Sequence, residues 1–120
     1  MVVTDLMLNE VAGDFAADSF YLGFSTDTAL EALSGATSLD GEIGSRISCT
    51  AVTVNNEVKV SGVRSSTLVI DTASGDTLTG IGLFDASTNG QLFTITTLPG
   101  ILHTINFDFD VDNAFTFDRG

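Results

Sequence analysis

From Arg46 to the end of the chain, apolar and polar residues alternate with a period of two, and this pattern restricts the fold more than any other feature. A two-residue period is the signature of a strand with one buried face, whereas a helix repeats every 3.6 residues. In the last run, residues 101–117, the alternation predicts one strand with an apolar inner face and an acidic outer face. The inward set is Ile105, Phe107, Phe109 and Val111, and the outward set is Asn106, Asp108, Asp110 and Asp112.

The stretch Leu78–Leu98 contains two β-type runs on either side of Asn89-Gly90. Asn-Gly readily takes the two left-handed positions of a type I′ turn, so we predict a hairpin. Within its first strand, Gly80 and Gly82 lack side chains and would let another group pack closely. Pro99-Gly100 is predicted to end the hairpin.

Residues 46–65 predict a second hairpin, which turns at Asn55-Asn56. The pattern places four valines on one face of it, with Thr53, Glu57, Lys59 and Ser61 facing outward. These valines are Val52, Val54, Val58 and Val60. Residues 66–72 predict a further strand, followed by a turn at residues 74–76.

The N-terminal third has a mixed pattern. Helical spacing over residues 3–12 predicts a short helix that stops at Gly13, and Phe20–Phe24 predicts a buried strand. Thr28 and Glu31 have the spacing of a capping box, which predicts a second helix of about two turns before the loop at 34–45. The chain is therefore expected to be one mainly β domain, residues 1–120. We predict an antiparallel β-sandwich or jelly-roll-like fold with one or two short N-terminal helices.

Sixteen acidic residues against four basic ones give the chain a net charge of −12, although 43% of its residues are hydrophobic. Acidic disordered chains lack such apolar content, so we expect the acids to cover a folded domain. Molar salt screens charges beyond about 3 Å, which favours adaptation to high salt; an ordinary acidic surface is the alternative. We expect no nucleic-acid partner because Lys and Arg clusters are missing, and we expect neither membrane insertion nor a signal peptide.

The series Asp108, Asp110 and Asp112 has the spacing with which a calcium loop opens. Such a loop needs Gly at its sixth position and Glu at its twelfth, where this chain has Asn113 and Arg119. The three carboxylates therefore indicate a solvated acidic face, with a weak cation site or a subunit contact as the alternative.

Other motifs do not indicate catalysis. His103 is the one histidine, so no imidazole pair can hold zinc, and we interpret it as a polar residue at a strand edge. Gly80-Ile81-Gly82 lacks the third glycine of a dinucleotide loop, and Cys49 is interpreted as a small buried strand residue. We expect no cofactor and no enzymatic activity; an enzyme would need the fold to join His103 to Asp and Ser residues.

Several segments, in order, resemble a family of small virion proteins from tailed viruses. They are FYLGFSTDTA, TALEAL, EIGSRI and LTGIGLFDASTNGQLF, followed by a Phe-rich tail, and they span roughly residues 20–112. The most specific part is a block similar to ITEIGLFDAATGGTLLARATL, which this chain matches at Gly82, Leu83, Phe84, Asp85, Ala86, Gly90 and Leu92. The chain departs from this block at two places. The family has an acidic residue where the chain has Gly80, and a basic residue where the chain has Thr96-Thr97.

The resemblance implies a structural subunit of the virion, at a capsid vertex or turret, as a decoration or connector protein, or in the tail. Together with the acidity, it suggests a virus of salt-loving archaea. The expected partners are copies of the chain itself, other capsid or tail proteins and, for the alternative of a tail-fibre or receptor-binding module, a host surface. The candidate interface residues, for which a core role is the alternative, are Phe20, Tyr21, Phe24, Phe84, Leu92 and Phe93.

Overall fold

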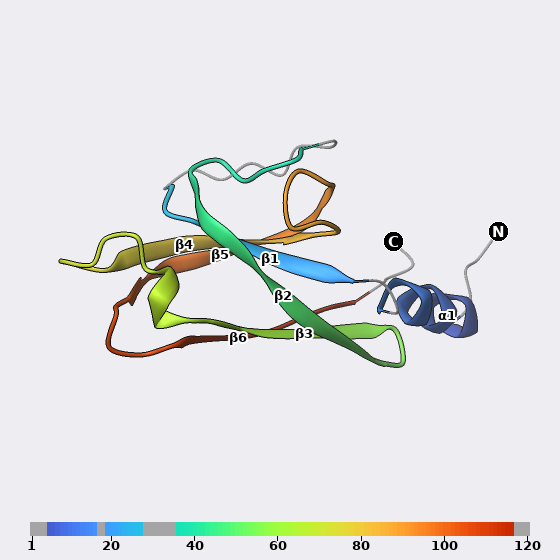
Figure 1. Cartoon of the computed structure of the whole chain (residues 1–120). Helices are drawn as coiled ribbons and strands as arrows, with labels where there is room; N and C mark the ends of the chain where they lie inside the picture. The colour runs from blue at the N-terminus through green and yellow to red at the C-terminus, as the bar shows by residue number, and fades with distance from the viewer. Residues whose placement is uncertain (1–4, 17–18, 28–35, 117–120) are drawn as a thin grey trace.

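The computed structural model describes residues 5–16, 19–27 and 36–116 (Figure 1). These residues form one α-helix, one short 3₁₀ helix and antiparallel strands. In chain order they are α1 (Asp5–Ala16), β1 (Phe20–Ser25), β2 (Glu42–Val54), β3 (Glu57–Arg64), η1 (Ser66–Leu68), β4 (Asp76–Phe84), β5 (Leu92–His103) and β6 (Phe109–Thr116). Within the described part of the chain, no helix is long and apolar enough to cross a membrane.

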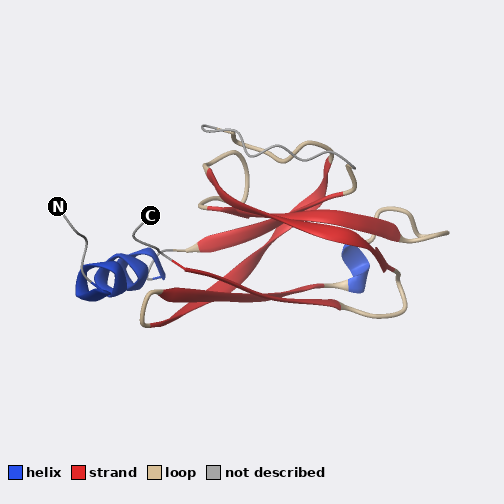
Figure 2. Cartoon of the chain, turned by 180° about the vertical axis from the view of Figure 1, so that it is seen from behind, coloured by secondary structure: helices blue, strands red, loops and turns tan. Residues whose placement is uncertain are grey.

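The strands form one sheet in the order β5-β4-β1-β2-β3-β6, which folds over so that its two halves face each other (Figures 1 and 2). Strand β2 belongs to both halves, because residues 42–49 pair with β1 and residues 50–54 pair with β3. The two end strands meet at a seam, where Asn113 Nδ2 on β6 donates to Thr96 Oγ1 on β5 over 2.6 Å. The predicted mainly β sandwich with a short N-terminal helix is confirmed.

Apolar side chains from both halves fill the space between them. This arrangement follows from the two-residue period, which gives each strand one apolar face. The buried core residues are Ala12, Phe20, Leu22, Phe24, Ile47, Val58, Val60, Leu78, Ile81, Leu83 and Val111.

Helix α1 lies at one end of the sandwich and is attached there by aromatic contacts. The Phe15 ring stacks on Phe20 at a centroid distance of 4.5 Å and also meets Phe93 and Phe115 edge to face. The prediction that Gly13 ends the helix was wrong: packing of Ala12 and Phe15 continues the helix to residue 16 and outweighs the poor helix propensity of glycine. The second predicted helix lies outside the described residues.

The β2–β3 hairpin is confirmed, but the predicted common face of its valines was wrong. The two-residue turn pairs Val54 with Glu57 and Thr53 with Val58. Paired residues share a face, so Val58 and Val60 are buried whereas Val52 and Val54 point outward with Glu57, Lys59 and Ser61. Thr53 lies on the inner face.

The β4–β5 hairpin is also confirmed, and Asn89 and Gly90 have the positive φ angles, 53° and 74°, that the sequence predicts. They lie in a longer loop, because pairing ends at Phe84 and Leu92. Pro99-Gly100 was predicted to break the strand, but β5 continues to His103. A register shift between Leu78 and Gly80 accommodates the proline on an end strand of the sheet.

Two further strand predictions were wrong. Residues 66–72 form η1 and irregular structure, because Ser65 caps a 3₁₀ turn by accepting from the Thr67 amide. The predicted single strand at 101–117 is, in its described part, the end of β5 and all of β6, joined by a turn at 104–108. Phe109 and Val111 face inward as predicted, but Ile105 and Phe107 are 51% and 49% exposed. A run that alternates without interruption does not reveal where the chain reverses.

We predict that Gly82→Ala lowers the free energy of unfolding by about 1–3 kcal/mol through overpacking. A Cβ at residue 82 would lie 2.9 Å from methyl groups of Leu39 and Leu92 and 3.0 Å from the Phe84 ring. Urea unfolding followed by circular dichroism measures the change. Gly13→Ala is the control, because nothing lies within 4 Å of its added Cβ and helix propensity should add up to about 1 kcal/mol. Equal stability of Gly82→Ala and the parent would contradict this account of the packing.

Candidate functional site

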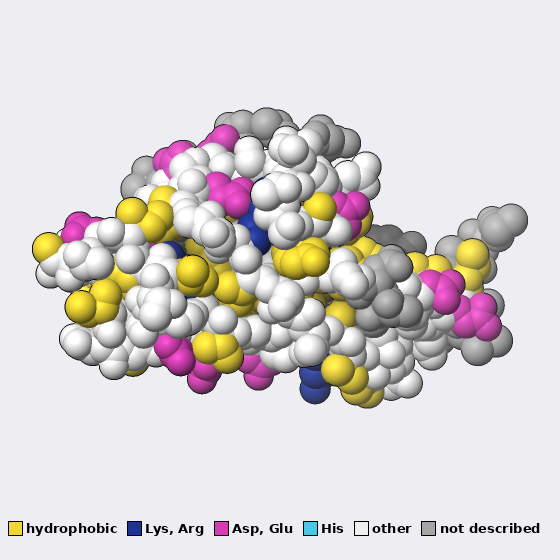
Figure 3. Space-filling model, viewed as in Figure 1, with side chains coloured by type: hydrophobic (Ala, Val, Ile, Leu, Met, Phe, Trp, Pro, Cys, Tyr) yellow, Lys and Arg dark blue, Asp and Glu magenta, His cyan; other side chains and the backbone are white. Residues whose placement is uncertain are grey.

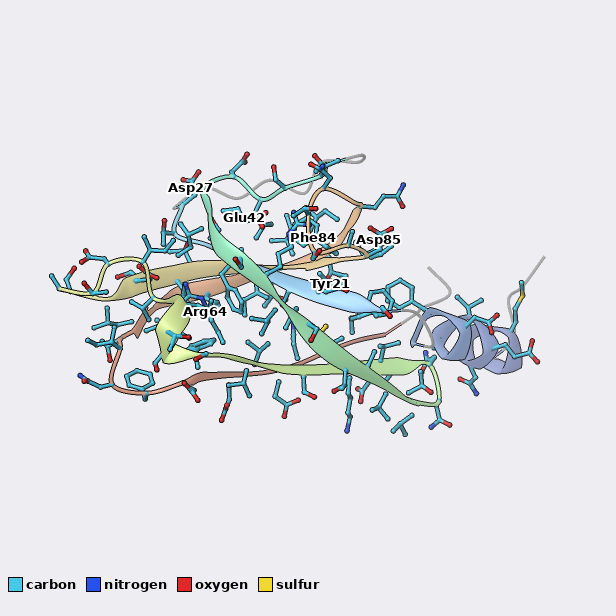
Figure 4. All side chains as sticks on the ribbon, viewed as in Figure 1. Tyr21, Asp27, Glu42, Arg64, Phe84 and Asp85 are labelled. Atoms are coloured by element: carbon cyan, nitrogen blue, oxygen red, sulfur yellow. The ribbon has the colours of Figure 1, made fainter. Side chains whose placement is uncertain are left out.

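A strip without side chains crosses the outer face of the β1–β4 pair, where Gly23 pairs with Gly82. Larger groups cover this strip: Leu39 from the preceding loop, the Phe84 ring and Leu92. Leu39 is 4% exposed and Phe84 is fully buried, so these groups form a second, small core outside the sheet. Figure 4 shows Phe84 and Glu42 between β1 and the loop above it. The glycines predicted to permit close packing therefore do so.

Arg46 lies over this small core because β2 bulges. Leu22 pairs with Ile47 and Phe24 with Ile43, so Gly44, Ser45 and Arg46 lie opposite the single residue Gly23. Gly44 takes the left-handed conformation that a bulge of this kind needs, with φ 65°. The guanidinium carbon of Arg46 lies 3.5 Å from the centre of the Phe84 ring, in a cation–π contact.

The Arg46 guanidinium binds two loops and its own strand. Nε donates to Glu42 Oε2 over 2.9 Å, Nη1 donates to the carbonyls of Ala86 and Asn89, and Nη2 donates to the carbonyl of Thr37. The Arg46 side chain is only 5% exposed. We call Arg46, Glu42 and Phe84 the arginine clamp.

The loop at 85–91 is closed from within by Asp85. Its carboxylate accepts from the Gln91 amide over 2.7 Å, and its backbone N–H donates to the Gln91 carbonyl. A Cβ at Gly90 would overlap Asp85 Oδ1, so the glycine is required for space as well as for its positive φ. The segment from Gly82 to Leu92 therefore acts as one structural unit with the clamp.

The two loops held by Arg46 border an open groove of about 540 Å³. Most of its lining residues have hydroxyl or amide side chains, and the groups that could offer charge, Arg46 and Glu42, already bind each other and the backbone. The groove can therefore offer neutral polar contacts. Its lining includes Thr37, Ser38, Ser45, Ser87, Thr88 and Asn89.

The candidate interface residues separate into two groups. Phe20 and Phe24 point into the main core and Phe84 into the small outer core, so the core alternative holds for these three and their side chains are not surface groups. Tyr21 and Leu92 are half-buried, and Phe93 is 42% exposed.

His103 is not the strand-edge polar residue that the sequence indicates, because it is fully buried at the far end of the sandwich. Its Nδ1 contacts Nη1 of Arg64, and Nη2 of Arg64 donates to Asp76 Oδ2 over 3.0 Å. Figure 4 shows Arg64 between the two halves of the sheet. Sequence reasoning missed Arg64 and Asp76; the pairing of Asp76 with His103 across β4 and β5 brings them together.

The hydrogen bonds fix the state of the imidazole. Arginine can only donate, so Nδ1 of His103 accepts, and Nε2 carries the proton and donates to the Phe107 carbonyl over 3.0 Å. This bond holds the 104–108 turn against the sandwich. A neutral, fully buried histidine with both nitrogens engaged serves the packing of this end.

The carboxylate of Asp76 organises the loop before β4. Burial alone would raise the pKa of Asp76, but hydrogen bonds from the Ile70 and Asp71 amides and the neighbouring Arg64 guanidinium hold this pKa below its ordinary value. The ionised form is therefore the one that the fold stabilises.

The remaining candidates lie on or near the surface. Asp110 and Asp112 point outward from β6 as predicted, while Asp108 lies in the preceding turn and accepts from the Ser66 amide over 2.8 Å. In the described ranges, no group of three or more His, Cys, Asp or Glu residues could hold a metal ion. Cys49 is a half-buried residue of β2, and desolvation raises the pKa of its thiol to about 11.

Comparisons with protein-family models, curated proteins and solved structures found no match for this chain.

Sequence reasoning also missed the role of Arg46, and one signal could have indicated it. The chain has only four Lys and Arg residues, and an acidic surface has little need of a cation unless the cation makes specific contacts. Arg46 lies in EIGSRI, and the structure places that segment against the GLFDA block.

We predict that Arg46→Lys lowers the free energy of unfolding by about 2–4 kcal/mol, because one ammonium cannot replace a planar group that stacks on Phe84 and donates in several directions. Urea unfolding is the measurement. Thr88→Ala, an exposed change in the same groove, is the control and should stay within about 0.5 kcal/mol. Parent-like stability of Arg46→Lys would show that the clamp is dispensable.

The Asp76 pKa predicts acid sensitivity of the fold. A carboxyl group whose pKa is lowered on folding stabilises the native state above its ordinary value of 3.8, and this contribution is lost as the pH falls through the folded value. Asp76→Asn should therefore be less stable than the parent at neutral pH and should lose less stability in acid. Unfolding between about pH 7 and pH 3 measures this difference. A parent and variant with parallel pH profiles would contradict the prediction.

Proposed function

We propose that this chain is a structural subunit of a tailed-virus particle, a capsid vertex or turret, decoration or connector protein that assembles as a symmetric homo-oligomer in molar salt. The observation that carries the proposal is the arginine clamp. The segments that resemble small virion proteins, EIGSRI and GLFDA with its Asn-Gly turn, meet in it.

The clamp gives the residues that carry the resemblance a mechanical role. Phe84 is covered by Arg46, Asp85 closes the loop and Gly90 leaves room for it. Each contact makes the loops rigid, and none leaves a reactive group facing the groove. A rigid presentation of loops suits a subunit that fits against neighbours in a particle.

The charge distribution supports the part of the proposal that the protein functions in molar salt. In the described residues, the side chains of Arg46 and Arg64 are at most 5% exposed, while most carboxylates lie at the surface. Such a surface repels itself in dilute buffer, and molar salt removes the repulsion.

The adhesion alternative has one observation in its favour. The groove between residues 37–38 and 87–89 offers hydroxyl and amide groups of the kind that bind sugars, and the clamp holds its two walls in place. The groove has no exposed aromatic ring in its lining, and therefore lacks the stacking surface that sugar sites commonly use.

The proposal predicts that the chain is part of the particle. An antibody against the purified chain should label tailed particles from the high-salt culture that carries its gene, and mass spectrometry of those particles should find the chain at a fixed ratio to the major capsid protein. Labelling at vertices or the portal supports the proposal, whereas labelling at fibre tips supports adhesion. Purified particles that lack the chain would refute both.

A further inference from the structure

No described residue covers the outer face of the β2–β3–β6 half. Its residues alternate with the buried ones, so the rows across the strands can be assigned from the register: Val52 lies beside Lys59, Thr50 beside Ser61 and Asp112, and Val63 beside Asp110. Val52 is 59% exposed and Val63 52%. We call the surface formed by Val52, Lys59, Val63, Asp110 and Asp112 the outer β3 face.

The outer β3 face carries a lysine, Lys59, that makes little contact within its own chain. Among the basic side chains that the structure describes, Arg46 and Arg64 are buried and hold loops, and Lys59 alone is exposed, at 56%. Within the described residues, its one ion pair is with Glu57 at 3.7 Å, an exposed contact of the kind that contributes little to stability. In the lower part of Figure 3, a basic side chain projects between acidic and hydrophobic ones.

We propose that the outer β3 face binds the same face of a second copy of this chain across a two-fold axis. Lys59 of each copy would meet the acidic row of Asp110 and Asp112 of the partner subunit, and the exposed valines would pack beside these ion pairs. The inference rests on the proposed self-assembly and names the surface that performs it.

Charge complementarity selects a second copy as the partner. A surface with a lysine beside an acidic row complements itself, because a two-fold axis makes every contact twice and brings each Lys59 to the other copy's acids. Elsewhere the net charge of −12 makes two copies repel each other. A contact in which each Lys59 meets the acids of the other copy is therefore the orientation in which two such chains repel least.

The middle of the outer β3 face is recessed. The surface is hollowed by a shallow depression of about 760 Å³, bordered by Ser48, Thr50, Val52, Lys59, Val63 and Asp112. Thr50 Oγ1 and Ser61 Oγ bind each other at 2.9 Å, which satisfies these hydroxyls within the chain and leaves the apolar side chains to form the contact. Molar salt screens the ion pairs but leaves the valine contact favourable, so the dimer should persist there.

The test uses two charge-reversed variants, Lys59→Glu and Asp112→Lys, in sedimentation velocity at about 0.15 M salt, where charges act over about 8 Å. Each variant alone places like charges opposite each other twice, so its association constant should fall by at least about tenfold. An equimolar mixture should recover association. When a Lys59→Glu copy meets an Asp112→Lys copy, the two changed positions carry opposite charges at one contact, and the native pair remains at the other. An interaction within one chain cannot be restored by mixing.

Two controls separate charge from packing. Asp40→Lys changes the net charge by the same amount as Asp112→Lys, but Asp40 lies in an exposed turn outside the outer β3 face. Apart from any gain due to the reduced net charge, this variant should keep the association constant within about twofold of the parent value. Val63→Thr keeps the shape of an exposed side chain and should weaken association at about 2 M salt while leaving the unfolding free energy unchanged within about 0.5 kcal/mol.

The outcomes distinguish this inference from the proposed function. A parent that forms an oligomer insensitive to Lys59→Glu and Asp112→Lys assembles through another surface, which refutes the inference and leaves the virion proposal standing. A strictly monomeric parent at both salt concentrations refutes the self-contact, and particle labelling then decides whether the chain binds a different capsid protein. Weakened variants that the mixture does not restore also refute the two-fold contact.

Discussion

Two guanidinium groups withdrawn from water hold the loops of this sandwich, Arg46 on the outer face of β1–β4 and Arg64 at the end away from α1, and the rest of the structure depends on them. A buried cation is costly unless its donors find partners. Both arginines bind mainly backbone carbonyls and carboxylates, although Arg64 Nε is buried without a hydrogen-bond partner among the described residues. Arg46 binds Glu42 and the loops at 37 and 86–89, whereas Arg64 binds Asp76, His103 and the Leu68 carbonyl. Because each group has several partners in different segments, losing one arginine would release several loops at once.

This use of cations explains why the chain can be so acidic. Salt ions weaken attractions between exposed charges, but they have little access to a buried pair such as Arg64 and Asp76. Placing cations inside and carboxylates outside therefore keeps internal electrostatic contacts effective in molar salt, while the hydrated acids keep the surface soluble. The interpretation of the net charge of −12 as adaptation to salt agrees with this division and remains part of the proposal.

The sequence predicted those parts of the fold that follow from local pattern. Alternation and the Asn-Gly turn were sufficient for the β4–β5 hairpin, and the two-residue turn at Asn55-Asn56 gave the β2–β3 hairpin. The face of Val52 and the chain reversal at 104–108 were missed because the side chains there remain apolar where the chain is exposed. The candidate site was beyond prediction for a different reason: Arg46 meets Phe84 only through a bulge and the pairing of distant strands.

The two outer faces of the sandwich differ in a way that bears on assembly. On the β1–β4 side, the glycine strip is covered by Leu39, Phe84 and the loops that Arg46 holds, so the chain uses this face itself. On the β2–β3–β6 side, Val52 and Val63 remain exposed and nothing within the described residues covers them. The chain uses one of its few cations, Arg46, to cover one face, and it places another, Lys59, on the exposed face. A second copy would remove this difference, because each copy would cover the face that the other leaves exposed.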